Sequence, residues 1–242
     1  HHNELQYITE ISLKSPATMI PQAKNELKRM ADMAQENLDR SIKGFLNQSD
    51  EYLNKIYHRE EDINNVSHAI TDYLVKSNQL SLPLADQKIL GSMFYVVNDI
   101  ERIGDHAENF ADYTKTELKH NTGLTGDAKE EIKKMYEAVS KLLKLSLESF
   151  MAQDGVNTQE DKLAEIAALE ASIDKMERRY QKHHIKRLAK GDCEPRAGLL
   201  FSDMLSELER IADHSVNIAY SMSDEDEDEM LAAENEALTT NN

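Results

Sequence analysis

Two carboxylates one helical turn apart, Glu101 and Asp105, lie in the stretch NDIERIGDH at residues 98–106. Residues four apart share one face of an α-helix, so these two side chains would present their oxygens together. Clustered carboxylate oxygens are the ligands that hard divalent and trivalent cations prefer. This pair of acids is therefore a candidate cation-binding site.

The same motif occurs a second time further along the chain. NDIERIGDHAEN at 98–109 is matched by SELERIADHSVN at 206–217, with Glu, Arg, Ile, Asp, His and Asn repeated at six of the twelve positions. The second copy contains Glu209 and Asp213 at the same spacing as the first pair. A repeated pair of acids indicates that each half of the chain has its own candidate site.

The second pair of acids lies within an otherwise apolar stripe. At helical spacing, Leu205 precedes Glu209 and Asp213, and Val216 and Tyr220 follow them. If this stripe packs against other helices, the two carboxylates are partly removed from water. Burying carboxylates without compensation is costly or forces them to protonate, and two neighbouring acids also repel each other. A bound cation would offset that cost.

Two other interpretations of the acids remain open. Acids at helical spacing commonly form a solvated face, and Lys or Arg from a neighbouring helix would also compensate them. Arg102 and Arg210 cannot pair easily with the acids next to them, because adjacent residues point about 100° apart. His106 and His214 recur with the motif but lie about 140° from its first Glu, so they are expected to cap an edge or meet solvent.

A weaker repeat upstream adds candidate ligands from another helix. REEDINNV aligns with LEASIDKM, which pairs Glu60 with Glu170 and Asn64 with Asp174. Glu60, Glu170 and Asp174 are therefore expected to supply further oxygen ligands beside the two acid pairs. Asn64 departs from the acidic pattern, so the two sites are not expected to be equivalent in every ligand.

The sequence gives little support for other residue patterns that bind metals or phosphate or that carry out catalysis. The single cysteine, Cys193, excludes an intramolecular disulfide framework and a thiolate-only metal site, and it fits a reducing compartment. A ferritin-like di-iron bundle needs paired Glu-x-x-His motifs, whereas only Glu117 and His120 have this spacing. No phosphate-binding G-x-x-x-x-G-K-[ST] loop occurs. No catalytic residue set is predicted.

The positions of helix breakers predict six long helices. Only 8 Gly and 4 Pro occur in 242 residues, with 40% apolar and 30% charged residues, a composition that favours long helices over strands. Because the acidic motif recurs on the third and sixth helix, we expect an all-α fold of two tandem up-down three-helix bundles. The predicted helices are 17–47, 50–76, 83–119, 127–152, 159–189 and 195–222.

The chain divides into four predicted segments: a lead-in at 1–16, a first repeat at 17–122, a second repeat at 123–222 and an acidic tail at 223–242. The net charge is −17, and the tail contributes eight acids and no base to it. Nucleic-acid binding is not expected, because neutralising phosphates requires clustered Lys and Arg. The tail is expected to be solvated, or to dock on a basic partner.

Neither a transmembrane helix nor a signal peptide is expected from the sequence. No run of about 18 apolar residues occurs, and no charged start followed by an apolar segment is recognisable. The chain begins with His1 and His2 rather than methionine, so a region upstream of it is expected.

The two copies of the motif, ERIGDHAEN and ERIADHSVN, resemble the signature of the PhoU family of phosphate-response regulators. The resemblance covers about residues 20–222. It implies a pair of three-helix bundles whose acidic motifs bind iron, zinc or other metal ions in clusters on the bundle surface. Carried to this sequence, it implies that metal ligands are present at Glu101, Asp105, Glu209 and Asp213, with Glu60, Glu170 and Asp174 as additional ligands.

The N-terminal stretch YITEISLKSPATMIPQAKNELKRMADMA is similar to the junction in sodium/phosphate cotransporter family proteins, where a membrane domain precedes a cytoplasmic PhoU-like domain. This resemblance implies a cytoplasmic location, as the cytosolic domain of an inner-membrane protein. It also implies a membrane transporter domain as partner, in the same polypeptide or a separate chain. Phosphate itself and a homo-oligomer are further expected partners.

The first functional hypothesis is therefore a cytoplasmic, metal-binding regulatory domain of a sodium-dependent phosphate transporter, without catalytic activity. Three alternatives remain open. One is a free-standing PhoU-type regulator of phosphate signalling. Another is an enzyme whose clustered carboxylates hold two metal ions for hydrolysis or oxidation. The last is a helical scaffold without metal, whose acids pair with bases across a subunit interface.

Overall fold

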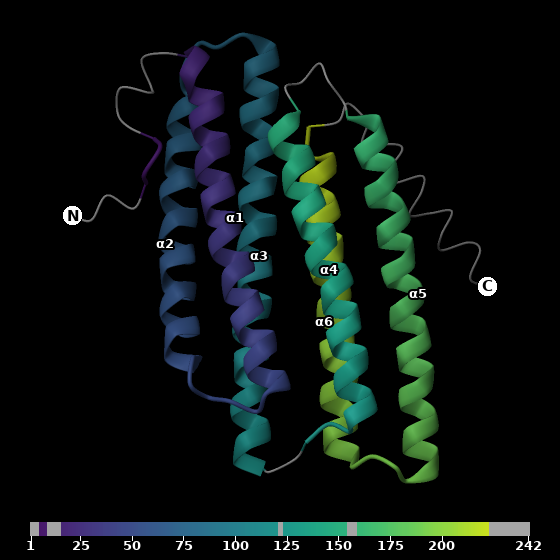
Figure 1. Cartoon of the computed structure of the whole chain (residues 1–242). Helices are drawn as coiled ribbons and strands as arrows, with labels where there is room; N and C mark the ends of the chain where they lie inside the picture. The colour runs from purple at the N-terminus through teal and green to yellow at the C-terminus, as the bar shows by residue number, and fades with distance from the viewer. Residues whose placement is uncertain (1–4, 9–15, 121–122, 154–158, 223–242) are drawn as a thin grey trace.

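The computed structural model describes residues 5–8, 16–120, 123–153 and 159–222, and α-helices account for all the regular secondary structure of these residues (Figure 1). The prediction of an all-α fold with six long helices is confirmed. Among the described residues, no helix is long and apolar enough to cross a membrane. The helices are α1 (Pro16–Leu46), α2 (Leu53–Asn78), α3 (Leu84–His120), α4 (Gly126–Ala152), α5 (Glu160–Lys190) and α6 (Pro195–Tyr220).

Each helix boundary lies within three residues of its predicted position. The second helix begins at Leu53 rather than Asp50, because Asp50 accepts a turn hydrogen bond of 3.2 Å from the Leu53 backbone N–H. The third begins at Leu84, one residue after Pro83. The Pro83 carbonyl accepts the first helical hydrogen bond, of 3.0 Å, from the Gln87 N–H, so the proline lies at the N-cap of α3.

The six helices form two three-helix bundles that lie side by side. The first contains α1, α2 and α3, and the second contains α4, α5 and α6. The bundles meet through two helix pairs, α3 with α6 and α1 with α4. Figure 1 shows α2 and α5 at the two outer edges, with the other four helices between them. The predicted architecture of two tandem bundles is therefore confirmed.

A single apolar core runs through both bundles. Four phenylalanines on four of the helices, Phe45, Phe110, Phe150 and Phe201, are almost completely buried. Buried apolar residues recur three or four positions apart on every helix, which gives each helix one apolar face; on α1 they include Leu27, Met30, Ala34, Leu38 and Ile42. Because this core is continuous across the α3–α6 and α1–α4 contacts, the relative position of the bundles is fixed by packing.

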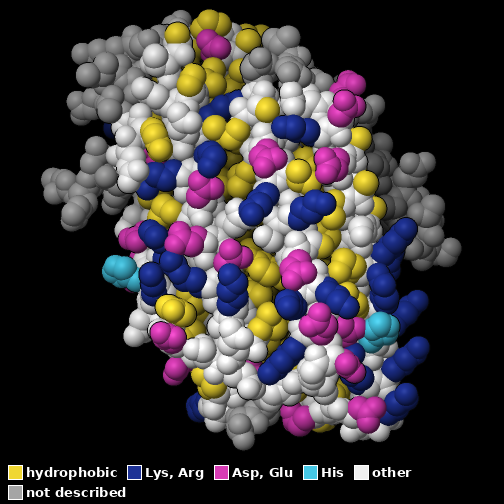
Figure 2. Space-filling model, viewed as in Figure 1, with side chains coloured by type: hydrophobic (Ala, Val, Ile, Leu, Met, Phe, Trp, Pro, Cys, Tyr) yellow, Lys and Arg dark blue, Asp and Glu magenta, His cyan; other side chains and the backbone are white. Residues whose placement is uncertain are grey.

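The surface between α1 and α4 carries charges of both signs. Figure 2 shows Lys and Arg interspersed with Asp and Glu on this side of the molecule, with apolar side chains between them. Ion pairs of this exposed kind contribute only about 0–1 kcal/mol each. We therefore assign the stability of the bundles to their core rather than to the charges of this face.

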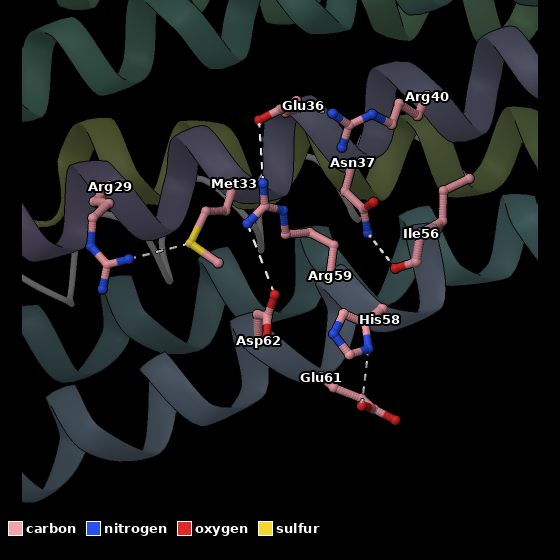
Figure 3. A network of polar contacts seen from close by, with 10 residues as sticks. All are labelled: Arg29, Met33, Glu36, Asn37, Arg40, Ile56, His58, Arg59, Glu61 and Asp62. Atoms are coloured by element: carbon pink, nitrogen blue, oxygen red, sulfur yellow. Dashed lines mark hydrogen bonds and ion pairs between the residues drawn. The ribbon is translucent and has the colours of Figure 1, made fainter. Parts of the chain in front are cut away.

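A polar network links α1 to α2 at their solvent-facing edge (Figure 3). Arg59 lies 3.9 Å from both Glu36 and Asp62, in pairs that are partly exposed. Asn37 differs from them, because it is buried and its Nδ2 donates a hydrogen bond of 3.1 Å to the Ile56 carbonyl. This buried bond lies at the first turn of α2 and fixes where that helix starts against α1.

The short described part of the predicted lead-in packs on α1. Ile8 is buried, and the fully buried Glu26 accepts hydrogen bonds from the backbone N–H groups of Tyr7 and Ile8. Arg29 pairs with the other oxygen of Glu26 at 3.1 Å. The rest of the predicted lead-in and the predicted acidic tail at 223–242 lie outside the described residues, apart from Pro16, which begins α1.

Replacing Gly191 by alanine is expected to destabilise the protein by about 1 kcal/mol. Gly191 ends α5 in the left-handed conformation, with φ of 73°, where a Cβ is unfavourable. Gly126→Ala is the matched control, because a Cβ at residue 126 would have no atom within 4 Å and Gly126 has no positive φ. Urea unfolding measures both; equal free energies of unfolding for the two variants would contradict this account of the α5 terminus.

Candidate metal centre

The acids of the first motif meet a carboxylate from the neighbouring helix. Glu60 lies on α2, whereas Asp105 and Glu108 lie on α3. One carboxylate oxygen from each of these three residues lies within 4.8 Å of the other two, the only such set among the Asp, Glu, His and Cys side chains that the structure describes. Three oxygens at this separation are close enough to bind one cation together.

Glu60 is the most deeply buried member of this set. It is 3% exposed, and neither of its carboxylate oxygens receives a hydrogen bond from a donor in the described part of the chain. Gly104 provides the space for this carboxylate, since a Cβ at residue 104 would lie only 2.9 Å from Glu60 Oε2. A buried carboxylate without a donor is unfavourable unless a proton or a cation compensates it.

The electrostatics of the set follow from this burial. Burial raises the pKa of Glu60 to about 8, and the neighbouring Asp105, Glu108 and Glu101 contribute to the shift in the same direction. Burial also raises the pKa of Glu108, with Asp112 and Asp105 contributing. Without a cation, the set therefore retains a proton near neutral pH. A bound cation favours the ionised carboxylates and would take the place of that proton.

Glu101 lies at the edge of the set rather than inside it. Its Oε2 accepts a hydrogen bond of 3.0 Å from Ser67 Oγ on α2. Further along α3, Asp112 Oδ1 accepts a hydrogen bond of 2.5 Å from the Tyr57 hydroxyl, also on α2. The acidic stripe of α3 thus faces α2 over about three helical turns. We name Glu60, Glu101, Asp105 and Glu108 the first cluster.

A second cluster lies between α5 and α6. Burial raises the pKa of Glu209 to about 8, with the Asp213 charge as the next cause. Burial, with the Asp213 and Asp174 charges, raises the pKa of Glu170 to about 7. The pKa values of Asp174, Glu177 and Asp213 are also raised, in each case chiefly by burial. These five acids make up the second cluster.

The second cluster is less tightly gathered and is partly compensated by a base. No three of its oxygens meet the 4.8 Å separation that the first cluster satisfies within the described residues. Arg178 lowers the pKa of Asp174 and of Glu177, against the larger effect of burial. The two clusters therefore have the same chemistry, many carboxylates and few donors, but different geometry.

Comparison with known proteins decides the family. The model of the PhoU domain family matches residues 27–114 and 132–222, one segment in each bundle. This chain belongs to the PhoU domain family. A relative from Thermotoga maritima, named phosphate-specific transport system accessory protein PhoU homolog 1, is 20% identical over 196 residues, which cover 81% of this chain and 82% of the relative. A Clostridium acetobutylicum protein named as a homolog of the same accessory protein is 23% identical over 199 residues, 81% of this chain and 87% of its own.

Solved PhoU structures share the fold of this PhoU domain. PhoU from Pseudomonas aeruginosa matches with a TM-score of 0.74 at 19% identity, covering 84% of this chain and 94% of that one. The phosphate transport system regulatory protein PhoU from Streptococcus pneumoniae gives 0.74 at 20% identity, with 86% and 95% covered. At these identities the likeness establishes the arrangement of the helices.

All seven acids that the sequence predicted as ligands lie in the two clusters of the PhoU domain. Their role as metal ligands stays a prediction. Glu108 and Glu177, which were not predicted as ligands, lie beside them. Both follow the predicted acids at helical spacing, and this spacing could have identified them. The predicted acids are Glu60, Glu101 and Asp105 in the first cluster, and Glu170, Asp174, Glu209 and Asp213 in the second.

The two halves of the PhoU domain place their acids on different helices. In the second cluster α5 supplies three acids, whereas at the equivalent positions α2 has Glu60, Asn64 and Ser67. On α3 an extra acid, Glu108, stands where α6 has Val216. The first bundle thus lacks two of the acids of α5 and has one additional acid on α3, and because Val216 stands at the equivalent position, the repeat does not reveal Glu108.

The prediction that the motif histidines cap an edge or meet solvent is wrong for His106. This residue is buried, and it contacts α6 rather than the first cluster. His214 is partly exposed and contacts α3. Neither histidine belongs to the three-oxygen set of the first cluster, but the sequence could not show that a second bundle covers that side of the helix.

The raised pKa of Glu60 predicts how the stability of the cation-free protein changes with pH. Its folded pKa of about 8 exceeds its ordinary value of 4.5, so the folded state binds more protons and becomes less stable as the pH rises between these values. Above about pH 8 the loss levels off. Each pKa unit corresponds to about 1.4 kcal/mol, so chelator-treated protein is expected to lose roughly a few kcal/mol between about pH 5 and pH 8.

Urea unfolding at several pH values measures this loss, and two variants isolate its source. Glu60→Gln removes this titrating group and is expected to reduce the loss of stability by the share of Glu60, leaving the share of Glu209 and Glu170, whose pKa values are also raised. Glu61→Gln is the matched control, because Glu61 is the adjacent acid and its side chain is 76% exposed. Identical pH profiles for the two variants would show that Glu60 is not the group responsible.

Proposed function

We propose that this protein is a metal-binding regulator of phosphate transport that acts through binding rather than catalysis. The single observation that carries the metal-binding part is the Glu60 carboxylate, which is buried without a hydrogen-bond donor from the described residues and lies beside Asp105 and Glu108. Membership of the PhoU family and the names of the relatives support the regulatory part, since those relatives are accessory proteins of phosphate-specific transport systems.

The comparisons favour a separate accessory protein over the transporter-fused domain that the N-terminal resemblance implied. The named relatives are themselves accessory proteins, and the match spans 82% and 87% of their lengths. We therefore propose a partner in a phosphate transport system, contacted from the cytoplasmic side of the membrane. Formation of a homo-oligomer stays a prediction from the sequence.

In the first cluster, Glu60, Asp105 and Glu108 are the proposed ligands, with Glu101 at the edge. All the donors are carboxylate oxygens, and such a set suits hard cations rather than ions that require thiolates. Iron and zinc are the metals that the family resemblance implies. In the second cluster the proposed ligands are Glu209, Asp213, Glu170, Asp174 and Glu177.

A bound cation would change the surface that the protein offers to its partner. It would neutralise part of the negative charge between α2 and α3, or between α5 and α6, and hold each helix pair together. Carboxylates rarely fill every coordination position of such an ion, so phosphate could complete the coordination. This would give the regulator a direct response to the ion whose transport it regulates.

Elemental analysis of protein purified without chelator tests metal binding. We expect bound metal in the wild-type protein, and loss of most of the metal of the second cluster in the double variant Glu209→Ala, Asp213→Ala. Glu60→Ala with Asp105→Ala should do the same for the first cluster. Glu61→Ala, an exposed acid on α2, is the control and should retain the wild-type content. Metal content that is unchanged in both double variants would refute the assignment.

Gly104→Ala is expected to weaken cation binding at the first cluster by about 10-fold. The new Cβ would displace the Glu60 carboxylate, which lies 2.9 Å from its position. Stability should not fall in parallel, because alanine is favoured over glycine inside a helix by about 1 kcal/mol. Gly91→Ala is the matched control, because Gly91 also lies on α3 and a Cβ at residue 91 would have no atom within 4 Å. This variant should gain that stability and keep the wild-type affinity for the cation. Mn²⁺ titration in the Glu209→Ala, Asp213→Ala background measures the first cluster alone; equal affinities in both glycine variants would contradict the role of Gly104.

A further inference from the structure

Beside the acidic clusters, a buried acid joins α3 to α6. Asp99 on α3 is 7% exposed, and its Oδ1 lies 2.9 Å from His214 Nδ1 on α6. The same oxygen accepts a hydrogen bond of 3.4 Å from Asn217 Nδ2. One carboxylate of the first bundle is therefore held by two side chains of the second bundle.

The reciprocal contact is present at the equivalent positions. Glu207 on α6 is 6% exposed, and its Oε1 accepts a hydrogen bond of 2.6 Å from Asn109 Nδ2 on α3. His106 Nδ1 lies 3.6 Å from the same oxygen. In the repeat alignment Glu207 corresponds to Asp99, and His106 and Asn109 correspond to His214 and Asn217. The two motifs thus bind each other with the same residue types.

The two histidine rings meet at the centre of these contacts, with their centroids 6.0 Å apart. The arrangement has the symmetry of two equivalent surfaces facing each other, as in a two-fold dimer, although one chain provides both. We name this set the clasp; it consists of Asp99, His106, Asn109, Glu207, His214 and Asn217.

The clasp and the first cluster use the same short segment of α3. Clasp residues Asp99 and His106 are seven apart, so they share one side of the helix. Asp105 and Glu108 project at least about 100° away from them, toward α2. On α6, Glu207 and His214 lie in the same relation to Glu209 and Asp213. Any shift of α3 that tightens the first cluster therefore moves clasp residues against α6.

We propose that the clasp couples the two acidic clusters, so that cation binding at one increases the cation affinity of the other. This rests on the proposed metal binding. A cation that draws α5 and α6 together orders α6, and the buried clasp contacts transmit this order to α3. The first cluster then binds its cation with less ordering of its own. Coupling of this type commonly changes an affinity by about 5-fold or more.

Hydrogen exchange of the full chain tests the transmission directly. In the variant Glu60→Ala, Asp105→Ala the first cluster cannot bind, so added Mn²⁺ loads only the second cluster. Mn²⁺ is the probe because it prefers carboxylates to the imidazoles of the clasp. Exchange is expected to slow in α5 and α6 and also in the 98–109 segment of α3. Adding Asp99→Ala and Glu207→Ala should abolish the slowing in α3 and leave that in α5 and α6.

Two further variants keep this test decisive. Asp99→Ala alone breaks only the contacts of the first acid and should remove about half of the α3 response, even if the double change prevents folding. Tyr136→Phe is the matched control, because it removes a hydrogen bond to Asp39 that also joins the two bundles, but between α4 and α1. The α3 response should persist in Tyr136→Phe.

Each outcome has a separate meaning. No slowing in α5 and α6 would overturn the proposed metal binding at the second cluster, and the coupling with it. Slowing in α5 and α6 without slowing in α3 would overturn the coupling alone. An α3 response that survives loss of the clasp, or that Tyr136→Phe removes equally, would assign the coupling to general packing and overturn the role of the clasp.

Discussion

In this protein α2 packs on α3, and α5 packs on α6, through interfaces that contain several carboxylates. Desolvation and like-charge repulsion oppose the packing of α2 on α3 and of α5 on α6, and they are the reason that the pKa values of Glu60 and Glu209 are raised. The apolar core holds the helices together in spite of this, and Gly104 allows the Glu60 carboxylate to enter. A proton or a cation would compensate these buried carboxylates.

The repeat of a three-helix unit explains why the chain has two acidic clusters at equivalent places. Each copy has one acidic cluster between its second and third helix, but the acids are distributed differently, since Glu108 has no equivalent on α6 and Glu177 has none on α2. The number of carboxylates is therefore similar while their positions vary. A site that requires several oxygens around a volume, rather than particular residues, tolerates such exchange.

The third helix of each copy serves two purposes at once. One side carries the acids, and another carries the histidine, asparagine and acid that bind the opposite copy through the clasp. The ERIGDH and ERIADH motifs are thus both a candidate ligand set and a contact between repeats. This double use accounts for residues of the repeated motif that metal binding alone leaves unexplained, such as His106 and Asn109.

The sequence by itself determined the helices and the identity of most candidate ligands, because helix periodicity, helix breakers and internal repeats are local patterns. It predicted all six helices and the seven acids that were found in the clusters. Only the tertiary structure decided that Glu60 is the most buried acid of the first cluster, that Glu108 meets Glu60 and Asp105 there, and that His106 faces α6 rather than solvent. These facts depend on which helices cover each face, and that is settled by packing between residues far apart in the chain.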